Sequence, residues 1–313
     1  MTSASRPEML DASDAAIARA AVLLEERRLV AVPTETVYGL AARADDAAAV
    51  AAIYRAKGRP DFNPLIVHVE DLRAAHALAE IDERAAGLAQ MFWPGPLTLV
   101  LPRRDDTRLA GAVTAGLPTV ALRCPAHPVM RALLERCEFP LAAPSANRSG
   151  GVSPTSAAHV AASLGDRVDA ILDGGACEAG LESTIVALRG EGGWQLLRPG
   201  PITERQLAAS LGPAGPARGG IEAPGQLESH YAPGKPMRLD ASTAEEGEFL
   251  IGFGNVTGQV NLSPSGDLSE AAARLYDALH QAAAAPEARI AVAAIPEKGI
   301  GAAINDRLRR AAA

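Results

Sequence analysis

The chain has 313 residues, of which 48% are hydrophobic and 21% are charged. This balance is typical of a globular protein and excludes a disordered one. The length suffices for one large domain or two smaller ones. The formal net charge is −7, so the chain as a whole offers no general attraction to nucleic-acid phosphates, although a local basic patch can still bind them.

Cysteine spacing and the N-terminal stretch predict a cytoplasmic protein. The cysteines lie far apart with no CxxC pair, which argues against a structural zinc site, and we predict no metal ligands in the chain. An odd number of cysteines without a secretion signal fits a reducing compartment. No apolar run reaches the ~20 residues that cross a bilayer, so we expect no membrane partner.

Strand-like and helix-like segments alternate over the first two thirds of the chain, which predicts an α/β fold with helices flanking a sheet. Apolar runs predict strands at 29–32, 65–69, 97–101, 119–123, 140–143, 168–172, 183–188 and 194–197. Helical spacing predicts helices at 15–28, from Asp45 or Asp46 to Lys57, at 72–93 with a break near Ile81, and at 128–137, 154–164 and 203–211. Pro154 suits a first helical position behind Ser153.

The composition changes at 212–236, which is rich in glycine and proline and has no apolar periodicity. This segment contains Ser229-His230-Tyr231, and since a free linker needs no aromatic pair, we expect the loop to dock on another part of the protein. Beyond it, the order strand, strand, helix, strand, helix over 237–313 predicts a second, smaller α/β domain. We therefore expect a main domain at 10–211, a linker at 212–236 and a C-terminal domain at 237–313.

The segment 30–64 combines the features of an anion site. A buried strand leads into a hydroxyl-rich turn, and Lys57 and Arg59 follow on a rigid helix exit at Gly58. Guanidinium groups bind phosphate oxygens bidentately and lysine adds a point charge, so we expect both cations at the surface of a cleft. The alternative, that they merely offset the dipole at a helix end, is about equally well supported by these residues.

Other polar residues stand at the ends of apolar strands, where ligands commonly bind in α/β folds. Ser145 and Asn147 could hold a phosphate or ribose there, although they also suit a simple turn. Arg123 and Arg198 end two further strands, and cations that recur at element ends indicate one polyanionic ligand. His68, inside an apolar strand, suits a satisfied core or pocket-wall position better than a base. Neither GxGxxG nor GxxxxGK[ST] occurs, so a bound nucleotide needs another device.

A series of motifs carries a resemblance to a known family. They read VPTETVYGLAARA, KGRPDFNPLIVHV, WPGPLTLVLP, TVALRCPAHP, PLAAPSANRSGGVSPT, LESTIV and LLRPG, with SHYAPGKPMRL beyond them. In these motifs the chain resembles the YrdC/Sua5 family, in its long form with a C-terminal Sua5 domain. The resemblance implies a catalytic YrdC-like domain with a twisted mixed sheet flanked by helices, a linker that lies as a lid over the active site, and a Rossmann-like C-terminal domain.

The resemblance also implies a reaction, a nucleotidyl transfer that makes threonylcarbamoyl-AMP and pyrophosphate from L-threonine, bicarbonate and ATP, with Mg²⁺ accompanying ATP. The product feeds the N6-threonylcarbamoyladenosine modification at position 37 of tRNAs that read ANN codons, through a downstream threonylcarbamoyl transferase complex, and tRNA contact is weak or indirect.

The family's functional positions can be carried over residue by residue. The catalytic pair matches Lys57 and Arg59. The ATP-binding positions match Lys57, Arg59, Asn63, Thr119, Ser145, Asn147, Ser153, Arg198 and Tyr231. The threonine-binding positions match Thr36, His68, Arg123 and Ser183. A threonine carbamate and a triphosphate are both anionic, so these cations together with Mg²⁺ would screen their repulsion.

Three alternatives compete with this interpretation. An RNA-binding module needs a basic, aromatic-studded face, which the acidic, aromatic-poor composition disfavours. A carbamoyltransferase of hydrogenase maturation embeds a YrdC-like domain, but those chains are much longer and carry paired zinc cysteines. A scaffold protein that only borrows the fold would not need intact ligand-binding positions.

Overall fold

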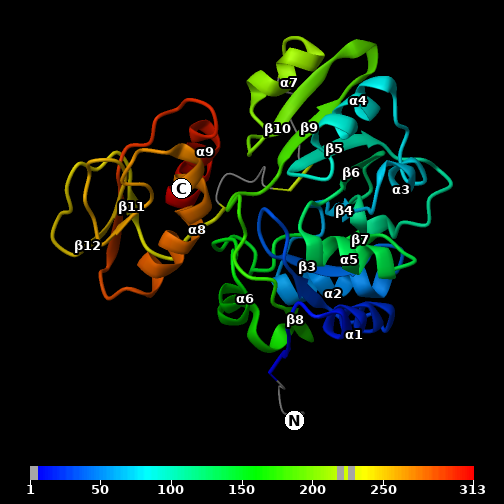
Figure 1. The fold of residues 1–313 in the computed structure, drawn as a ribbon, viewed down its shortest axis with the longest axis horizontal. Coiled ribbons are helices and arrows are strands. Elements are labelled where there is room, and N and C mark those ends of the chain that lie inside the picture. Colours follow the sequence, from blue (N-terminus) through cyan, green and yellow to red (C-terminus); the bar gives the residue numbers. More distant parts are fainter. Residues whose placement is uncertain (1–5, 217–221, 225–229) are drawn as a thin grey trace.

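The structure of the protein is a computed structural model that describes residues 6–216, 222–224 and 230–313. Figure 1 shows a larger body formed by the N-terminal two thirds and a smaller one formed by the C-terminal third, each with its own sheet. Much of the predicted linker, including Ser229, lies outside the described residues.

Among the described residues, ten strands form one mixed sheet in the order β1-β8-β2-β3-β7-β4-β6-β5-β9-β10. They are β1 (Glu8–Leu10), β2 (Val30–Val32), β3 (Gly39–Arg43), β4 (Ile66–His68), β5 (Leu97–Pro102), β6 (Thr119–Arg123), β7 (Leu141–Ala142), β8 (Ala170–Leu172), β9 (Thr184–Leu188) and β10 (Trp194–Arg198). β4 pairs in parallel with β6 so that His68 stands opposite Arg123. Residues opposite each other on paired strands point to the same face, so this register brings two predicted site residues together.

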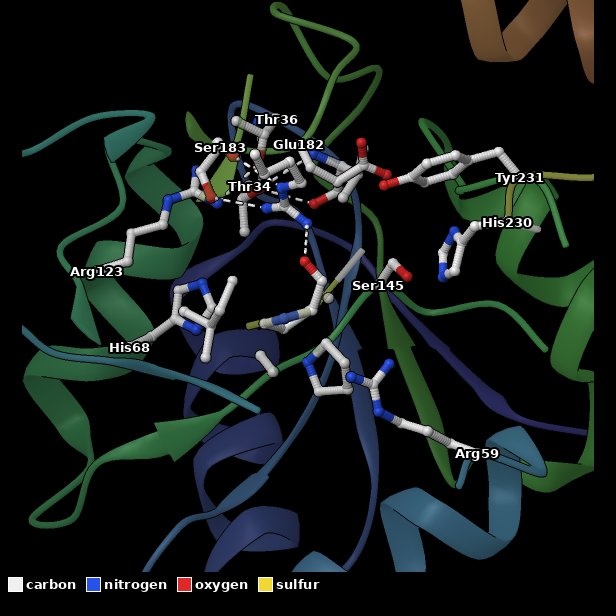
Figure 2. A pocket seen from close by; sticks show the side chains of 17 residues that line it. Thr34, Thr36, Arg59, His68, Arg123, Ser145, Glu182, Ser183, His230 and Tyr231 are labelled. Atoms are coloured by element: carbon white, nitrogen blue, oxygen red, sulfur yellow. Dashed lines mark hydrogen bonds between the residues drawn. The ribbon is translucent and has the colours of Figure 1, made fainter. Parts of the chain in front are cut away.

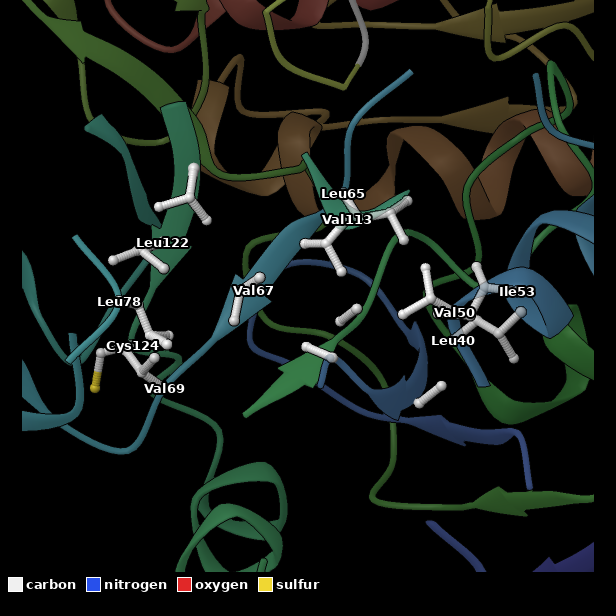
Figure 3. Packing of buried hydrophobic residues seen from close by; sticks show 14 of the residues in the cluster. Leu40, Val50, Ile53, Leu65, Val67, Val69, Leu78, Val113, Leu122 and Cys124 are labelled. Carbon is white, nitrogen blue, oxygen red and sulfur yellow. The ribbon is translucent and has the colours of Figure 1, made fainter. Parts of the chain in front are cut away.

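Helices cover both faces of this sheet. They are α1 (Asp14–Glu25), α2 (Ala47–Lys57), α3 (Leu72–His76), α4 (Glu83–Phe92), α5 (Pro128–Arg136), α6 (Ala157–Leu164) and α7 (Glu204–Leu211), with 3-10 turns at Gly111–Val113, Gly165–Arg167 and Gly190–Gly192. Alternate residues of β3 face two different cores: Leu40 packs with Val50 and Ile53 of α2 (Figure 3), whereas Ala41 joins Leu24 of α1 on the other face. The large sheet is therefore buried on both sides.

The C-terminal third forms a parallel sheet in the order β11-β14-β12-β13. Its elements are β11 (Met237–Arg238), β12 (Glu248–Gly252), β13 (Val260–Asn261), α8 (Leu268–Ala284), β14 (Arg289–Val292) and α9 (Gly301–Ala312). α8 and α9 lie between the small sheet and the larger body (Figure 1). A Cβ added to Gly180, in the loop before β9, would lie 2.4 Å from the Cα of Ala273 on α8, so the two parts touch backbone to backbone.

The predicted fold, a mixed sheet flanked by helices with a second, smaller α/β unit, is confirmed. Strands predicted over 29–197 are present within two residues of the predicted bounds. The sequence pattern misses β1, β3 and β13. β3 reads GLAAR, and a strand of glycine and alanine lacks the β-branched residues that mark strands. In the part of the chain that the structure describes, no helix is both long and apolar enough to cross a membrane.

The predicted start of the helix at Pro154 is wrong, since α6 begins at Ala157. Ser156 accepts the capping hydrogen bond from the amide of His159. The carbonyl of Pro154 instead accepts a hydrogen bond from the amide of Tyr38. Ser153 is thus not a helix cap but part of an extended segment that runs beside the hydroxyl-rich turn.

Both ends of α2 are well defined, and its C-terminal end carries the predicted cations. Asp46 caps the helix by accepting hydrogen bonds from the amides of Ala48 and Ala49. Gly58 ends it in the left-handed conformation, with φ of 60°. The chain therefore turns sharply between Lys57 and Arg59.

We predict that Gly58→Ala lowers the free energy of unfolding by about 1 kcal/mol, because an alanine must adopt the left-handed conformation there. A Cβ at Gly58 meets nothing within 4 Å, so sterics from neighbours do not contribute. Gly87→Ala is the matched control: it lies inside α4, its Cβ also meets nothing within 4 Å, and alanine stabilises a helix interior by about 0.5 kcal/mol or more. Denaturant unfolding measures both, and equal effects would contradict the left-handed turn.

Candidate active site

A pocket lies where the hydroxyl-rich turn after β2 meets the ends of β4, β6 and β10 (Figure 2). Its cavity volume is about 40 Å³, enough for a water molecule but not for a nucleotide in this arrangement. A larger cavity of about 780 Å³ lies between α7 and α9 and is lined by other residues. We take the smaller pocket as the candidate site because the predicted residues converge on it. Cavity size alone does not identify a binding site.

Many of the predicted site residues line this pocket: Thr36, Arg59, His68, Arg123, Ser145, Ser183, Arg198 and Tyr231. Others lie behind or away from its wall: Lys57, Asn63, Thr119, Asn147 and Ser153. Figure 2 shows His68 and Arg123 on one side and Arg59, His230 and Tyr231 on the other. The pocket therefore has two chemically distinct sides.

Lys57 is buried, with 3% of its surface exposed, so the expectation of a surface cation is wrong. Its Nζ donates hydrogen bonds of 2.5 Å to the carbonyl oxygens of Ser145 and Asn147. Burial, aided by the nearby charge of Arg59, lowers the pKa of Lys57 well below its ordinary value. Lys57 thus ties the end of α2 to the loop after β7.

Arg59 and Arg198 are also buried, so the expectation that Arg59 is a surface cation is wrong. The hydrogen bonds of both arginines go to neutral oxygens. Arg59 donates to the carbonyls of Asn63 and Pro64 at 3.3 and 3.0 Å. Arg198 donates to the carbonyl and the hydroxyl of Ser183 at 3.0 and 3.1 Å. Burial lowers the pKa of both guanidinium groups, that of Arg59 to about 10. Neither guanidinium donates a hydrogen bond to a carboxylate among the described residues, although the charge of Glu182 acts on Arg198. Both therefore keep the capacity to bind an anion.

Arg123 differs because a carboxylate neutralises it. Its Nη2 donates to Glu35 at 2.7 Å and its Nη1 to the hydroxyl of Thr36 at 2.8 Å. Burial would raise the pKa of Glu35, but the charge of Arg123 and its hydrogen bond outweigh this and lower it. Glu35 is a site residue that the sequence analysis missed, although its place between Thr34 and Thr36 in the hydroxyl-rich turn is a usable signal.

His68 is a neutral side chain in the pocket wall. Burial, aided by the charge of Arg123, lowers its pKa to about 3. Its Nδ1 is buried and has no hydrogen-bond partner among the described residues. A neutral imidazole of this kind can offer one hydrogen bond to a ligand.

Four further predicted residues do not line the pocket. Asn63 and Asn147 are buried, and the Oδ1 of each lacks a hydrogen-bond partner within the described ranges. The hydroxyl of Ser153 donates a hydrogen bond of 2.5 Å to the Glu182 carboxylate. Thr119 pairs with Pro102 at the start of β6, about 13 Å along the strand from its last residue, so the structure does not bring it into the pocket.

Glu182 is a buried carboxylate in the pocket wall that the predicted site leaves out. It accepts hydrogen bonds from Ser153, from the hydroxyl of Tyr276 at 2.8 Å and from Arg307 at 2.9 Å. Burial would raise its pKa, but the charges of Arg307 and Arg198 outweigh this and lower it to about 2. The sequence shows an acidic residue next to the predicted site residue Ser183. It gives no sign that residues of α8 and α9 contact Glu182.

The described end of the linker reaches the pocket. His230 and Tyr231, whose ring centroids are 4.1 Å apart, both line it. The Nδ1 of His230 and the hydroxyl of Tyr231 are buried and lack a partner in the part of the chain that the structure covers. Burial lowers the pKa of His230 to about 3 and raises that of Tyr231. The aromatic pair therefore lies against the rest of the protein, with polar atoms left for a ligand.

The pocket is suited to an anion with several hydrogen-bonding groups. Buried polar atoms in proteins nearly always have partners, so a gathering of unpaired ones marks a place that a ligand completes. On the pocket lining they belong to His68, His230 and Tyr231, and off the lining to Asn63 and Asn147. Within residues 6–216, 222–224 and 230–313, no group of three His, Cys, Asp or Glu side chains could hold a metal ion.

Two family models match the chain. The model described as Sua5/YciO/YrdC, telomere recombination, matches residues 22–200. The model described as threonylcarbamoyl-AMP synthase, C-terminal domain, matches residues 202–313.

Curated relatives match over nearly the full length. The threonylcarbamoyl-AMP synthase of Bacillus subtilis is 40% identical over 97% of this chain and 94% of its own. That of Pyrococcus abyssi is 41% identical over 93% and 92%. The human threonylcarbamoyl-AMP synthase is 35% identical over 61% and 69%.

Solved structures show a similarity to the same group of proteins. P. abyssi Sua5 in complex with L-threonine superimposes with a TM-score of 0.89 at 37% identity, covering 97% of each chain. A structure of HypF in its phosphate- and nucleotide-bound form gives 0.52 at 22% identity over 59% of this chain and 30% of that one, a likeness of fold alone. With two family models side by side and full-length relatives near 40% identity, the chain belongs to the Sua5/YciO/YrdC family, in the two-domain form of the threonylcarbamoyl-AMP synthases, which are nucleotidyltransferases.

Proposed function

We propose that this chain makes threonylcarbamoyl-AMP and pyrophosphate from L-threonine, bicarbonate and ATP in the cytoplasm. The names of its full-length relatives support the product, and the P. abyssi Sua5 complex with L-threonine supports the amino-acid substrate. The observation that carries the proposal is the presence of Arg59 and Arg198 in one pocket, both buried and both hydrogen-bonded to neutral oxygens. A triphosphate is the ligand that such a pair attracts most strongly.

The reaction joins two anions. The neutral amine of threonine condenses with bicarbonate to a carbamate with loss of water, and a carbamate oxygen then attacks the α-phosphorus of ATP while pyrophosphate leaves with the bonding electrons. Arg59 and Arg198 would stabilise the negative charge that develops on the phosphates. The rest of the rate enhancement would come from positioning, with no covalent enzyme intermediate.

The other side of the pocket suits the amino acid. Arg123 would hold the threonine carboxylate with the two N–H groups that its contacts to Gly95, Thr36 and Glu35 leave open. Its pairing with Glu35 would weaken its attraction for the triphosphate. His68, Thr36 and Ser183 would complete the hydrogen bonds of the amino acid.

Lys57 takes a different role from the direct phosphate contact that the sequence suggests. Because its Nζ is bound to two carbonyls of the loop after β7, it would set the position of Ser145 and Asn147 and add positive potential from behind the wall. ATP contact would then come from Ser145, from Asn63 and Asn147 after side-chain adjustment, and from Tyr231. Thr119 and Ser153 are the predicted contacts that this geometry favours least.

Mg²⁺ would enter with ATP as part of the substrate. Glu182 lines the pocket and is engaged by Arg307, and Glu35 is engaged by Arg123, so both carboxylates fit poorly as ligands of a protein-held ion. Mg²⁺ commonly binds through substrate phosphates and water, and the triphosphate would supply those ligands.

The linker would act as a lid between domains at 10–211 and 237–313. The present cavity is too small for ATP, so part of its wall must move, and Pro224, His230 and Tyr231 belong to that wall. A closed lid would keep water from the labile carbamate and the mixed anhydride.

The product would serve the N6-threonylcarbamoyladenosine modification at position 37 of tRNAs that read ANN codons. A mixed anhydride is unstable in water, so it needs a downstream threonylcarbamoyl transferase to consume it. The net charge of −7 supports weak or indirect tRNA contact.

We predict that the purified protein releases pyrophosphate only when ATP, L-threonine and bicarbonate are all present. A coupled pyrophosphate assay with each substrate omitted in turn tests this, and mass spectrometry identifies the product. Pyrophosphate release that does not depend on threonine would contradict the proposal, and tight RNA binding without such release would favour an RNA-binding module.

Arg198→Gln should lower kcat/KM for ATP about 100-fold, because it removes a charge aimed at the developing phosphate charge. The free energy of unfolding should change by less than about 1 kcal/mol, since the variant loses the hydrogen bonds to Ser183 but also the cost of holding a charge away from water. Arg104→Gln is the control: Arg104 is exposed and paired with Asp106 at 3.0 Å, and both quantities should stay at wild-type values. An unchanged kcat/KM in Arg198→Gln would remove this residue from the site.

Tyr231→Phe should affect stability and ATP binding in opposite directions. It deletes a buried hydroxyl without a partner, so the free energy of unfolding should rise by about 1 kcal/mol, while the dissociation constant for ATP increases. Tyr38→Phe is the control, because the Tyr38 hydroxyl donates to the carbonyl of Gly175 at 2.7 Å and its loss should destabilise. Calorimetric titration and thermal unfolding measure both, and unchanged ATP affinity in Tyr231→Phe would show that the hydroxyl does not meet the nucleotide.

A further inference from the structure

The C-terminal third of the chain contributes a buried cation to the back of the pocket wall. Arg307 on α9 has no exposed surface. Its Nε donates to Glu182 at 2.9 Å and its Nη2 to the carbonyl of Pro199 at 2.9 Å. Its guanidinium also lies 5.3 Å from the ring centroid of Tyr231. One side chain therefore touches two residues of the pocket lining from outside.

Glu182 stands between two arginines. Its Oε2 accepts from Arg307 and from the hydroxyl of Tyr276 on α8, and its Oε1 accepts from Ser153. Arg198 is near enough for its charge to lower the pKa of Glu182, yet it donates to both oxygens of Ser183, the next residue in the chain. Within the described ranges, Glu182 thus forms an ion pair with Arg307 and none with Arg198.

We propose that Arg307, assisted by Tyr276, is a positioning residue for ATP binding: it holds the Glu182 carboxylate on the side of the C-terminal domain and so leaves Arg198 available to the triphosphate. This inference rests on the function proposed above. It makes the C-terminal domain a functional part of the active site.

The physical reason is the cost of a buried, unpaired carboxylate. If Arg307 were neutral, the Glu182 carboxylate would lose its charged partner in a site from which water is excluded. The neighbouring Arg198 would then be the nearest cation with which it could pair. An internal ion pair between these two would compete directly with the phosphates of ATP.

The surroundings of Arg307 favour this arrangement. Its Nη1 donates to Asp306 at 2.7 Å, and Asp306 also accepts from Arg310 at 3.0 Å. One carboxylate serves two arginines within α9, so this cluster keeps a net positive charge that can bind the Glu182 carboxylate. The domain contact is also tight elsewhere, since His280 on α8 stacks on His159 on α6 with ring centroids 3.9 Å apart.

The test compares Arg307→Gln with the double variant Glu182→Gln, Arg307→Gln in the full-length protein. Arg307→Gln should raise the ATP dissociation constant, measured calorimetrically, and the KM for ATP about tenfold or more, with the KM for threonine within about twofold of wild type. The double variant leaves no carboxylate to compete for Arg198, so it should bind ATP more tightly than the single variant. Arg309→Gln on the same helix, where the arginine is exposed and paired with Glu297 at 2.7 Å, should match wild type.

If Arg307→Gln fails to fold, Tyr276→Phe provides the same test, because it removes one hydrogen bond to Glu182 and keeps the ring. Its ATP affinity should fall, and adding Glu182→Gln should restore it. A double variant that binds ATP no better than the corresponding single variant would overturn the inference. The proposed function would still stand if the wild-type protein turned over its substrates. A wild-type protein that neither binds ATP nor releases pyrophosphate would overturn both.

Discussion

Positive charge buried without a carboxylate hydrogen bond is the constraint on which the rest of this structure depends. Lys57, Arg59 and Arg198 converge on one small region, and burial lowers the pKa of each. Holding such charges away from water costs free energy, which the apolar packing on both faces of the large sheet must offset. The site is therefore costly for the free protein to maintain, and an anionic ligand relieves that cost.

Carboxylates decide which cations remain available. Glu35 pairs with Arg123, and Glu182 is held by Arg307, so these two carboxylates leave Arg59 and Arg198 without a carboxylate hydrogen bond. This separation divides the pocket into a nearly neutral side and a positive side. In the proposed function, this separation would keep the amino acid and the triphosphate from competing for the same cations.

Local sequence patterns predicted the sheet, most helices and many wall residues, because strand ends and the Gly58 turn are encoded within a few residues. They failed where a property depends on distant parts of the chain. The burial of Lys57 follows from the carbonyls of Ser145 and Asn147, which lie 88 and 90 residues further on. Likewise, Glu182 and its partner Arg307 are 125 residues apart, and no periodicity in either segment indicates that they meet.

The charge on Arg307 explains why a second domain that lies outside the pocket can still affect its chemistry. An acidic residue packed behind the wall would neutralise the pocket arginines and weaken anion binding. A cation in the same place does the opposite, since it satisfies Glu182 and adds positive potential while remaining inaccessible to the ligand. Because its Nη2 also binds the carbonyl of Pro199, next to Arg198 in the chain, a shift of α9 would move both the carboxylate and the backbone that carries the pocket arginine. Electrostatics and position at the site are therefore coupled to how the C-terminal domain packs.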